Sequence, residues 1–212
     1  MHKRSLIIIG AGGFGREVLM YAEASVDNGA DYIIKGFLDD DLSALDKYKY
    51  GYNVIDTIGN YEICNEDIFI CAIGDVKVKK KVCIELQKRG AEFTNVIHPT
   101  AIIGKTTSMG FGNIFCPMSI ITQNVKIGNF ISINTSSSFG HDSKVGNYTT
   151  ISGGCSVTGY AELGKGVFLG GQSFICPNVS IGDYARIGAG SVVIKNVKAN
   201  SVVFGNPAVE IF

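Results

Sequence analysis

The sequence has no surplus of charge and little proline, and each lack excludes a class of protein. Among its 212 residues, 19 are basic and 19 are acidic, so the formal net charge is zero. A balanced chain has no general attraction to nucleic acid or to an anionic membrane surface. Only four prolines are present, which excludes a collagen or a Pro-rich linker, and a 46% share of hydrophobic residues excludes a disordered chain.

Long hydrophobic runs and paired cysteines are also missing. The longest apolar runs, such as Leu6–Ile9 and Ile68–Ile73, are too short to span a bilayer. No secretory signal is visible, so we expect a cytoplasmic protein with no membrane span. None of the six cysteines forms a Cys-x-x-Cys pair. We therefore expect reduced, buried thiols and no metal site.

Glycine is abundant, with 27 residues, and it belongs to a repeat. Every sixth residue from Ile97 to Val193 is large and apolar, at all 17 positions of the register. Chance placement at this composition gives about eight. The next position is glycine in nine of these repeats. Because α-helical faces recur every 3.6 residues, a period of six indicates short strands with a bend after each. We expect the glycines to supply the unusual backbone angles of those bends.

The repeat resembles the hexapeptide left-handed parallel β-helix, in which three short strands close one triangular coil of 18 residues. The pattern spans residues 97–198 without insertion, which is five to six coils. At roughly 4.8 Å per coil the prism is about 27 Å tall. The resemblance, and not the spacing, implies the left hand. Residues 199–212 follow as a C-terminal tail.

Residues 1–96 follow a different pattern, in which strands and helices alternate. A buried strand at Leu6–Ile9 leads directly into Gly10-x-Gly12-x-x-Gly15 and then a helical stretch. This is the dinucleotide fingerprint, in which glycines let backbone N–H groups approach a phosphate. Asp39, which ends the next predicted strand, is placed to accept hydrogen bonds from a ribose. The module is only half of a full Rossmann fold, so we expect a small Rossmann-like domain that binds a phosphate or a nucleotide sugar.

Together the two parts resemble one family, the sugar acetyltransferases of the sialic-acid O-acetyltransferase, bacillosamine N-acetyltransferase and perosamine N-acetyltransferase type. The resemblance rests on Ile7–Gly15, Phe37–Asp40, Ala72–Gly74, Asn134–Asp142 and the ending Gly205–Ala208. It implies an acetyl-CoA-dependent acyltransferase with no metal. The implied substrate is an amino group on a nucleotide-linked deoxysugar of the 4-amino-4,6-dideoxyhexose type, for surface glycan biosynthesis.

The resemblance also assigns catalytic residues. His141 matches the family's general base, and the adjacent Asp142 matches the carboxylate that raises its basicity. An imidazole that titrates near neutral pH suits this task. Gly159 stands 18 residues later and therefore one coil above His141. Its backbone N–H matches the family's donor to the thioester oxyanion.

The family's binding residues carry over with two departures. Acetyl-CoA would lie along the prism near Gly159, Thr150, Gly171, Gly188 and Ala189, with Val202–Pro207 over its adenine end. The bacillosamine enzyme has histidines where this chain has Thr150 and Phe14, which indicates a different sugar or nucleotide. The implied substrate-binding set in the N-terminal domain is Gly12, Gly13, Phe14, Asp39, Asp40 and Gly74. Proteins of this family form homotrimers with sites between neighbours.

Two other functions stay open at this stage. O-acetylation of sialic acid or of another glycan sugar needs the same base, so His141 does not decide between them. A non-catalytic nucleotide-binding scaffold has the same fold but has no use for a His–Asp pair. A γ-type carbonic anhydrase needs three histidines on zinc, and the chain offers only His98 and His141 once the terminal His2 is set aside. We expect the run Lys77, Lys79, Lys80, Lys81 to be a solvated helix face.

Overall fold

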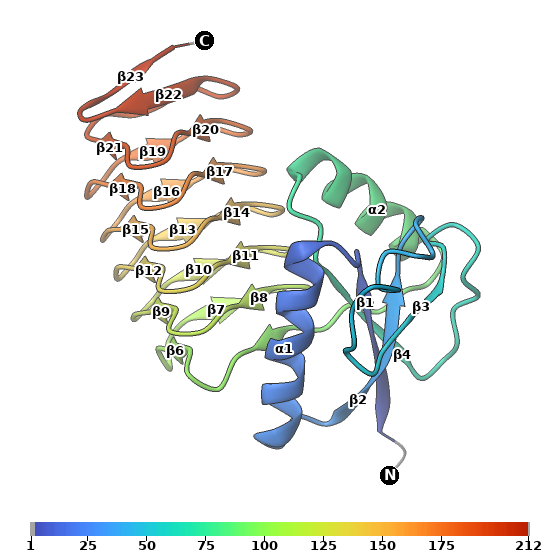
Figure 1. Cartoon of the computed structure of the whole chain (residues 1–212). Helices are drawn as coiled ribbons and strands as arrows, with labels where there is room; N and C mark the ends of the chain where they lie inside the picture. The colour runs from blue at the N-terminus through green and yellow to red at the C-terminus, as the bar shows by residue number, and fades with distance from the viewer. Residues whose placement is uncertain (1–2, 212) are drawn as a thin grey trace. The chain divides into compact units, whose positions relative to one another are not determined.

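The computed structural model describes residues 3–211, so His2 lies outside the described residues. The chain divides into two compact units, Met1–Pro99 and Thr100–Phe212 (Figure 1). The sequence placed the border a few residues earlier, between 96 and 97. No described helix is both long enough and apolar enough to cross a membrane.

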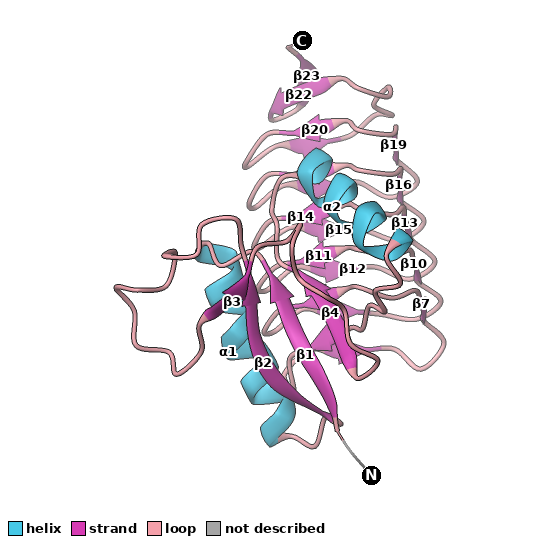
Figure 2. Cartoon of the chain, turned by 90° about the vertical axis from the view of Figure 1, so that its right-hand side faces the viewer, coloured by secondary structure: helices cyan, strands magenta, loops and turns pink. Residues whose placement is uncertain are grey.

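The first unit is a four-stranded parallel sheet with two helices (Figure 2). The strand order is β3-β2-β1-β4, with β1 and β2 in the middle of the sheet. The run of apolar residues that ends β1 is fully buried, as its lack of alternation predicts. The elements are β1 (Arg4–Ile9), α1 (Gly13–Asp27), β2 (Tyr32–Leu38), β3 (Val54–Asp56), β4 (Asp67–Cys71), α2 (Val76–Lys88) and β5 (Val96–Ile97).

Two glycines of the fingerprint serve packing between β1 and α1. Gly10 has a φ of +95°, which disfavours other residues. A Cβ at Gly15 would overlap the carbonyl oxygen of Gly10, so only glycine lets the helix approach the strand this closely. Gly12 is the N-cap of α1 and makes no side-chain cap. The predicted strand–turn–helix is confirmed.

The second unit is the predicted left-handed β-helix, and its strands follow the six-residue register. The inward residue of each strand from β8 to β22 is buried and belongs to one continuous core. The strands are β6 (Ile102–Ile103), β7 (Ser108–Met109), β8 (Ile114–Phe115), β9 (Ile120–Ile121), β10 (Lys126–Ile127), β11 (Ser132–Ile133), β12 (Ser138–Phe139), β13 (Lys144–Val145), β14 (Thr150–Ile151), β15 (Ser156–Val157), β16 (Glu162–Leu163), β17 (Phe168–Leu169), β18 (Phe174–Ile175), β19 (Ser180–Ile181), β20 (Arg186–Ile187), β21 (Val192–Val193), β22 (Val202–Gly205) and β23 (Ala208–Glu210).

These strands form three parallel sheets, one on each face of the prism. The β6 face contains β6, β9, β12, β15, β18 and β21, and the β7 face contains β7, β10, β13, β16 and β19. The β8 face contains β8, β11, β14, β17, β20 and β22. From β6 to β21, partners in neighbouring coils are 18 residues apart, as in Lys126 opposite Lys144. A residue can therefore be placed above or below another by counting 18. The last coil is shorter, with Arg186 opposite Val202.

The expected role of the repeat glycines is wrong. The glycines that follow the inward residue do not have positive φ. A Cβ on one of them, Gly140, would stand 2.5 Å from the nitrogen of Gly159 in the next coil. These positions need glycine because the coils approach closely there. The left-handed bends lie two residues later, and most are occupied by other residues: Met118, Asn124, Phe130, Ser136, Asp142, Tyr148, Tyr160, Gln172, Asn178 and Tyr184.

The tail prolongs the prism. β22 pairs in parallel with β20, so coil-type pairing continues past residue 198. β23 then turns back and pairs antiparallel with β22. The six cysteines are free, and the expectation that they are buried is wrong at Cys64, which is exposed, and at Cys176, which is only partly buried.

Candidate active site

His141 and Asp142 lie on the edge of the prism between the β6 face and the β7 face. The Nδ1 atom of His141 and the Oδ2 atom of Asp142 are 2.9 Å apart, and the two side chains are 60% and 35% exposed. Asp142 occupies a left-handed bend with a φ of +61°, and its N–H donates to the carbonyl of Gln123 at 3.1 Å. With Nδ1 bound to the carboxylate, Nε2 is the ring nitrogen that is left to accept a proton.

The next coil holds the imidazole in place. A Cβ at Gly159 would stand 2.9 Å from both Cε1 and Nε2 of His141, so the ring lies directly against this glycine. The Tyr160 N–H donates to the His141 carbonyl at 3.0 Å. The Tyr160 ring is edge-on to the imidazole, with centroids 5.2 Å apart. The structure thus brings His141, Asp142 and Gly159 together as predicted, and it adds Tyr160.

The N–H group of Gly159 is available to a ligand. At the same position of other repeats, the side chain one coil above accepts this hydrogen bond, as Asp183 does from the Lys165 N–H at 2.8 Å. One coil above Gly159 is Pro177, which has no side-chain acceptor. Among residues 3–211, no group accepts a hydrogen bond from the Gly159 N–H. A developing oxyanion can therefore take it without displacing a protein group.

The other residues expected at acetyl-CoA lie elsewhere on the same prism. Gly171 and Ala189 are stacked on the edge between the β8 face and the β6 face, with Gly188 beside them. Thr150 is in β14, on the β8 face. The β6 face separates that edge from His141. A single chain therefore does not gather these four residues around the catalytic pair.

In the first unit, the rim of the glycine loop is open. A Cβ at Gly12 or at Gly74 would meet nothing within 4 Å, and both residues are exposed. Gly12 has an ordinary φ of −67°, so neither contacts within the protein nor backbone strain require glycine there. The free space at the N-terminus of α1 is where a phosphate could approach backbone N–H groups. Gly13 and Phe14 form the first turn of that helix.

Asp39 is already engaged by the backbone. Its Oδ2 accepts the N–H of Ala11 at 2.7 Å, and its Oδ1 accepts the N–H of Asp41 at 3.0 Å. The Asp39 carboxylate therefore fixes the conformation of the glycine loop. Both of its oxygens already accept hydrogen bonds from the protein backbone, whereas the sequence predicted that they would accept from a ribose. Asp40 is exposed, with Oδ1 accepting the Ile58 N–H at 3.3 Å. Sequence reasoning missed Arg16, whose guanidinium carbon lies 4.3 Å from the centroid of the Tyr48 ring, because the spacing gives no sign of that contact.

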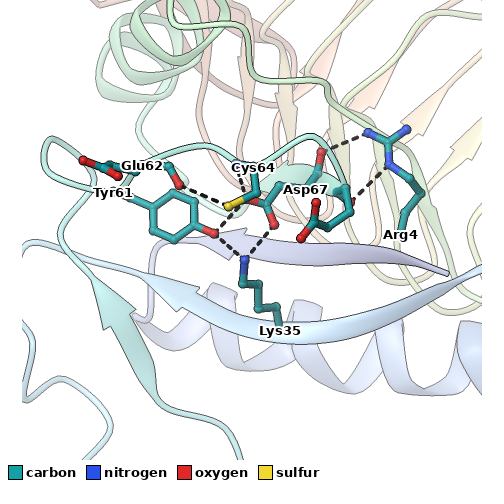
Figure 3. A network of polar contacts seen from close by, with 7 residues as sticks. Arg4, Lys35, Tyr61, Glu62, Cys64 and Asp67 are labelled. Atoms are coloured by element: carbon teal, nitrogen blue, oxygen red, sulfur yellow. Dashed lines mark hydrogen bonds and ion pairs between the residues drawn. The ribbon is translucent and has the colours of Figure 1, made fainter. Parts of the chain in front are cut away.

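A separate polar network ties the loop before β4 to the sheet (Figure 3). Lys35 Nζ donates to Tyr61 Oη at 2.7 Å and to Asp67 Oδ1 at 2.8 Å, and Tyr61 Oη donates to Asp67 Oδ2 at 2.8 Å. Burial acts to raise the pKa of Asp67, but hydrogen bonds from Lys35, the Cys64 N–H and Tyr61 hold this pKa below its usual value. Burial raises the pKa of Tyr61 to about 12. The network is intramolecular and stabilises the fold.

The predicted solvated lysine face of α2 is wrong at one position. Lys79 is 1% exposed. Burial lowers its pKa to about 8, and the nearby Cys71, Cys83 and Asp75 act in the opposite direction.

Among the described residues, no group of three or more His, Cys, Asp or Glu side chains is arranged to hold a metal ion.

Comparison with protein families agrees with the two-part organisation. The PglD N-terminal domain matches residues 5–86. The bacterial transferase hexapeptide family, described as six repeats, matches residues 160–195. No curated protein matches the chain by sequence.

Solved structures match over nearly the full length. The acetyltransferase domain of PglB from Neisseria gonorrhoeae FA1090, in complex with acetyl coenzyme A, is 24% identical, with 99% of this chain and 100% of that chain covered and a TM-score of 0.89. WeeI from Acinetobacter baumannii AYE is 28% identical, with 97% and 99% covered and a TM-score of 0.87. PerB from Caulobacter crescentus, in complex with CoA and GDP-perosamine, is 24% identical, with 98% and 97% covered and a TM-score of 0.89. The N-terminal part therefore matches the PglD N-terminal domain, the later part matches the bacterial transferase hexapeptide repeats, and the whole chain has the fold of these solved structures.

Proposed function

We propose that the protein transfers the acetyl group of acetyl-CoA to the amino group of a nucleotide-linked 4-amino-4,6-dideoxyhexose. The observation that carries this proposal is the hydrogen-bonded pair of His141 and Asp142 beside the available Gly159 N–H. Similar structures contain acetyl coenzyme A in one case, and CoA with GDP-perosamine in another. A scaffold protein has no need for an exposed base in this geometry.

The chemistry assigned to each residue follows from the geometry. The acceptor nitrogen attacks the thioester carbonyl carbon while His141 Nε2 removes a proton from that nitrogen. The carbonyl oxygen becomes an oxyanion and accepts the Gly159 N–H. When the tetrahedral species collapses, the carbon–sulfur bond breaks, and the thiolate of CoA takes up the proton from His141. Asp142 keeps the imidazole in the tautomer with the free Nε2 and stabilises the imidazolium.

The acceptor's nucleotide is assigned to the first unit. We place its phosphates against the open rim formed by Gly12, Gly13 and Gly74, where the helix terminus favours negative charge. Phe14 and the exposed Asp40 would contact the sugar or the nucleoside. Asp39 acts as a positioning residue, since it already holds the loop.

We infer a cytoplasmic homotrimer. Three of the residues assigned to acetyl-CoA, Gly171, Gly188 and Ala189, lie on a different edge of the prism from His141 and Gly159. A closed ring of three prisms would set the edge of one copy against the neighbouring copy, which supplies both groups to one site. Six thiols without a disulfide are compatible with a reducing compartment.

The proposal is tested by thiol release from acetyl-CoA. The purified protein is offered UDP-, dTDP- and GDP-linked 4-amino-4,6-dideoxyhexoses, with CMP-sialic acid and free sialic acid in parallel. Turnover on one amino sugar supports N-acetylation and names the nucleotide. Turnover only on a sialic acid moves the assignment to O-acetylation. No turnover, together with no binding of CoA by calorimetry, leaves a nucleotide-binding scaffold.

Replacing Gly159 by alanine is expected to lower kcat by at least 100-fold. The new methyl group would stand 2.9 Å from His141 Cε1 and Nε2, so the imidazole must move away from the acceptor. The measurement is steady-state kinetics with the acceptor found above. Gly153→Ala, at the same repeat position on another edge, is the control, since its Cβ meets nothing closer than 3.2 Å. Equal losses in both variants would contradict a specific role for Gly159.

Replacing Asp39 by asparagine is expected to weaken binding of the nucleotide sugar about tenfold, since a charged acceptor of two backbone N–H groups is lost. The two bonds, to Ala11 at 2.7 Å and to Asp41 at 3.0 Å, shape the loop that faces the phosphates. Calorimetry with the nucleotide sugar measures the change. The affinity for CoA is expected to stay constant. The exposed Asp31→Asn is the control, and an unaltered affinity in Asp39→Asn would contradict the positioning role.

A further inference from the structure

The contact between His141 and Asp142 is too exposed to fix the imidazole by itself. The two side chains are 60% and 35% exposed, with Nδ1 and Oδ2 2.9 Å apart. An exposed contact between titratable side chains contributes little, because both groups are solvated and can rotate. The imidazole therefore needs a further contact if Nε2 is to point in one direction during the reaction.

Two residues of the next coil enclose the imidazole. Gly159 lies against it, since a Cβ there would stand 2.9 Å from Cε1 and from Nε2. The Tyr160 ring stands at 87° to the imidazole, with centroids 5.2 Å apart. Gly159 limits the movement of the imidazole but has no side chain to attract it. Tyr160 does attract it, because two aromatic rings at this distance and angle form a favourable edge-to-face pair.

The backbone of Tyr160 is tied to the histidine that its ring contacts. The Tyr160 N–H donates to the carbonyl oxygen of His141 at 3.0 Å. This bond fixes the bend from which the tyrosine ring projects relative to the backbone of His141. The ring is therefore anchored to the same two coils that it would hold in register around the imidazole.

Neither the bend nor the core explains a tyrosine at position 160. The bend has a φ of +60°, and one coil above, Asn178 has the same conformation with a φ of +61°. Asparagine adopts this conformation more readily than tyrosine does. Tyr160 is also 55% exposed, so it is not a core residue. At another bend, Tyr148 stacks on Phe130 with centroids 5.1 Å apart, whereas the ring partner of Tyr160 is His141.

We propose that Tyr160 is a positioning residue for the general base, whose ring holds the His141 imidazole against Gly159 with Nδ1 toward Asp142. This inference rests on the proposed function, in which His141 Nε2 removes the proton of the acceptor. Tyr160 itself transfers no proton. Its ring makes the contact, so phenylalanine can replace it. An edge-to-face pair shifts a conformational equilibrium by about two- to tenfold, which sets the size of the expected effect.

The test is steady-state kinetics on Tyr160→Asn, which removes the ring but suits the left-handed bend. We expect kcat to fall about fivefold, with the KM of each substrate within about twofold of the wild-type value. Tyr160→Phe is expected to keep kcat within about twofold. Tyr148→Asn is the matched control, because it makes the same substitution at a left-handed bend and also loses an aromatic contact. Its kcat is expected to stay at the wild-type value.

The same substitution in a His141→Ala background separates positioning from a direct role. A positioning residue acts only through the imidazole, so Tyr160→Asn is expected to leave the residual kcat of His141→Ala unchanged. A further fivefold fall in that background would overturn the proposal. An equal loss of kcat in Tyr160→Phe, or a raised KM with an unchanged kcat in Tyr160→Asn, would also overturn it, because the tyrosine would then contact a substrate.

A spectroscopic measurement tests the inference even if no acceptor is acetylated and the proposed function fails. Nitrogen-15 spectra of labelled histidine at alkaline pH report which ring nitrogen carries the proton. The chain has three histidines, and the signal of His141 is the one that His141→Ala lacks. We expect the proton on Nδ1 in the wild-type protein and a mixture of both tautomers in Tyr160→Asn. Identical His141 signals in the two proteins would overturn the positioning role.

Discussion

Replacing His141 by alanine is expected to lower kcat for acetyl transfer by about 10²–10⁴-fold, the usual contribution of a general base. The His141 imidazole has Nδ1 bound to the Asp142 carboxylate at 2.9 Å, which leaves Nε2 as the nitrogen that can accept the proton. No neighbouring side chain can replace it, since Tyr160 presents a ring edge and Gly159 has no side chain. Binding of both substrates is expected to be retained.

Further variants separate the role of the base, His141, from that of the carboxylate that orients it, Asp142. His141→Asn keeps a polar group but cannot accept the proton at neutral pH, so it is expected to match alanine. Asp142→Asn keeps the size of the carboxyl but loses its charge, and a smaller loss of kcat is expected than for His141→Ala, because the carboxylate acts only through the imidazole. His98→Asn is the matched histidine control, because His98 lies in the first unit and packs edge-on against Tyr21. Activity of His141→Ala within tenfold of the wild-type value would contradict the assignment.

The prism could be predicted closely because one repeat unit sets both local and tertiary structure. Each inward residue of the six-residue register, such as Ile127 or Val145, buries itself against the same position 18 residues away. The bends could not be placed from composition. A glycine at position 140 indicates either a positive φ or a close approach between two segments of backbone. Only the stacked coils show that the reason is the close approach of the next coil, at Gly159.

The candidate site was predictable where it follows the register, and not where it depends on side-chain direction. Counting 18 residues placed Gly159 over His141. Tyr160 shares its repeat position with Tyr148 and Tyr184, so the sequence predicts for all three a packing role at the corners or at a subunit interface and does not single out Tyr160. Asp39 was expected at a ribose because its place at the strand end fits the fingerprint. The bond to Ala11 depends on the loop's own shape, which no spacing reveals.

Replacing Asp67 by asparagine is expected to destabilise the first unit by about 3 kcal/mol, the lower end for breaking a buried ion pair, because Lys35 is partly exposed. The side-chain exposures are 0% for Asp67 and 34% for Lys35. The neutral amide cannot accept from Lys35, Tyr61 and the Cys64 N–H as strongly as the carboxylate does. Urea unfolding followed at 222 nm measures the loss selectively, because both helices lie in the first unit.

The double variant and the pH dependence identify charge as the cause. Adding Lys35→Met to Asp67→Asn is expected to recover part of the lost unfolding free energy, since the double variant no longer contains a lysine without its carboxylate partner. The folded pKa of Asp67 is depressed. Its contribution is therefore present above the unfolded pKa, about 3.9, and is lost as the pH falls through the lower folded pKa. Asp46→Asn, on the exposed loop, is the control, and we expect it to change neither the free energy of unfolding nor its dependence on pH. Equal acid sensitivity of wild type and Asp67→Asn would contradict this account, because the variant has no carboxyl group at residue 67 to titrate.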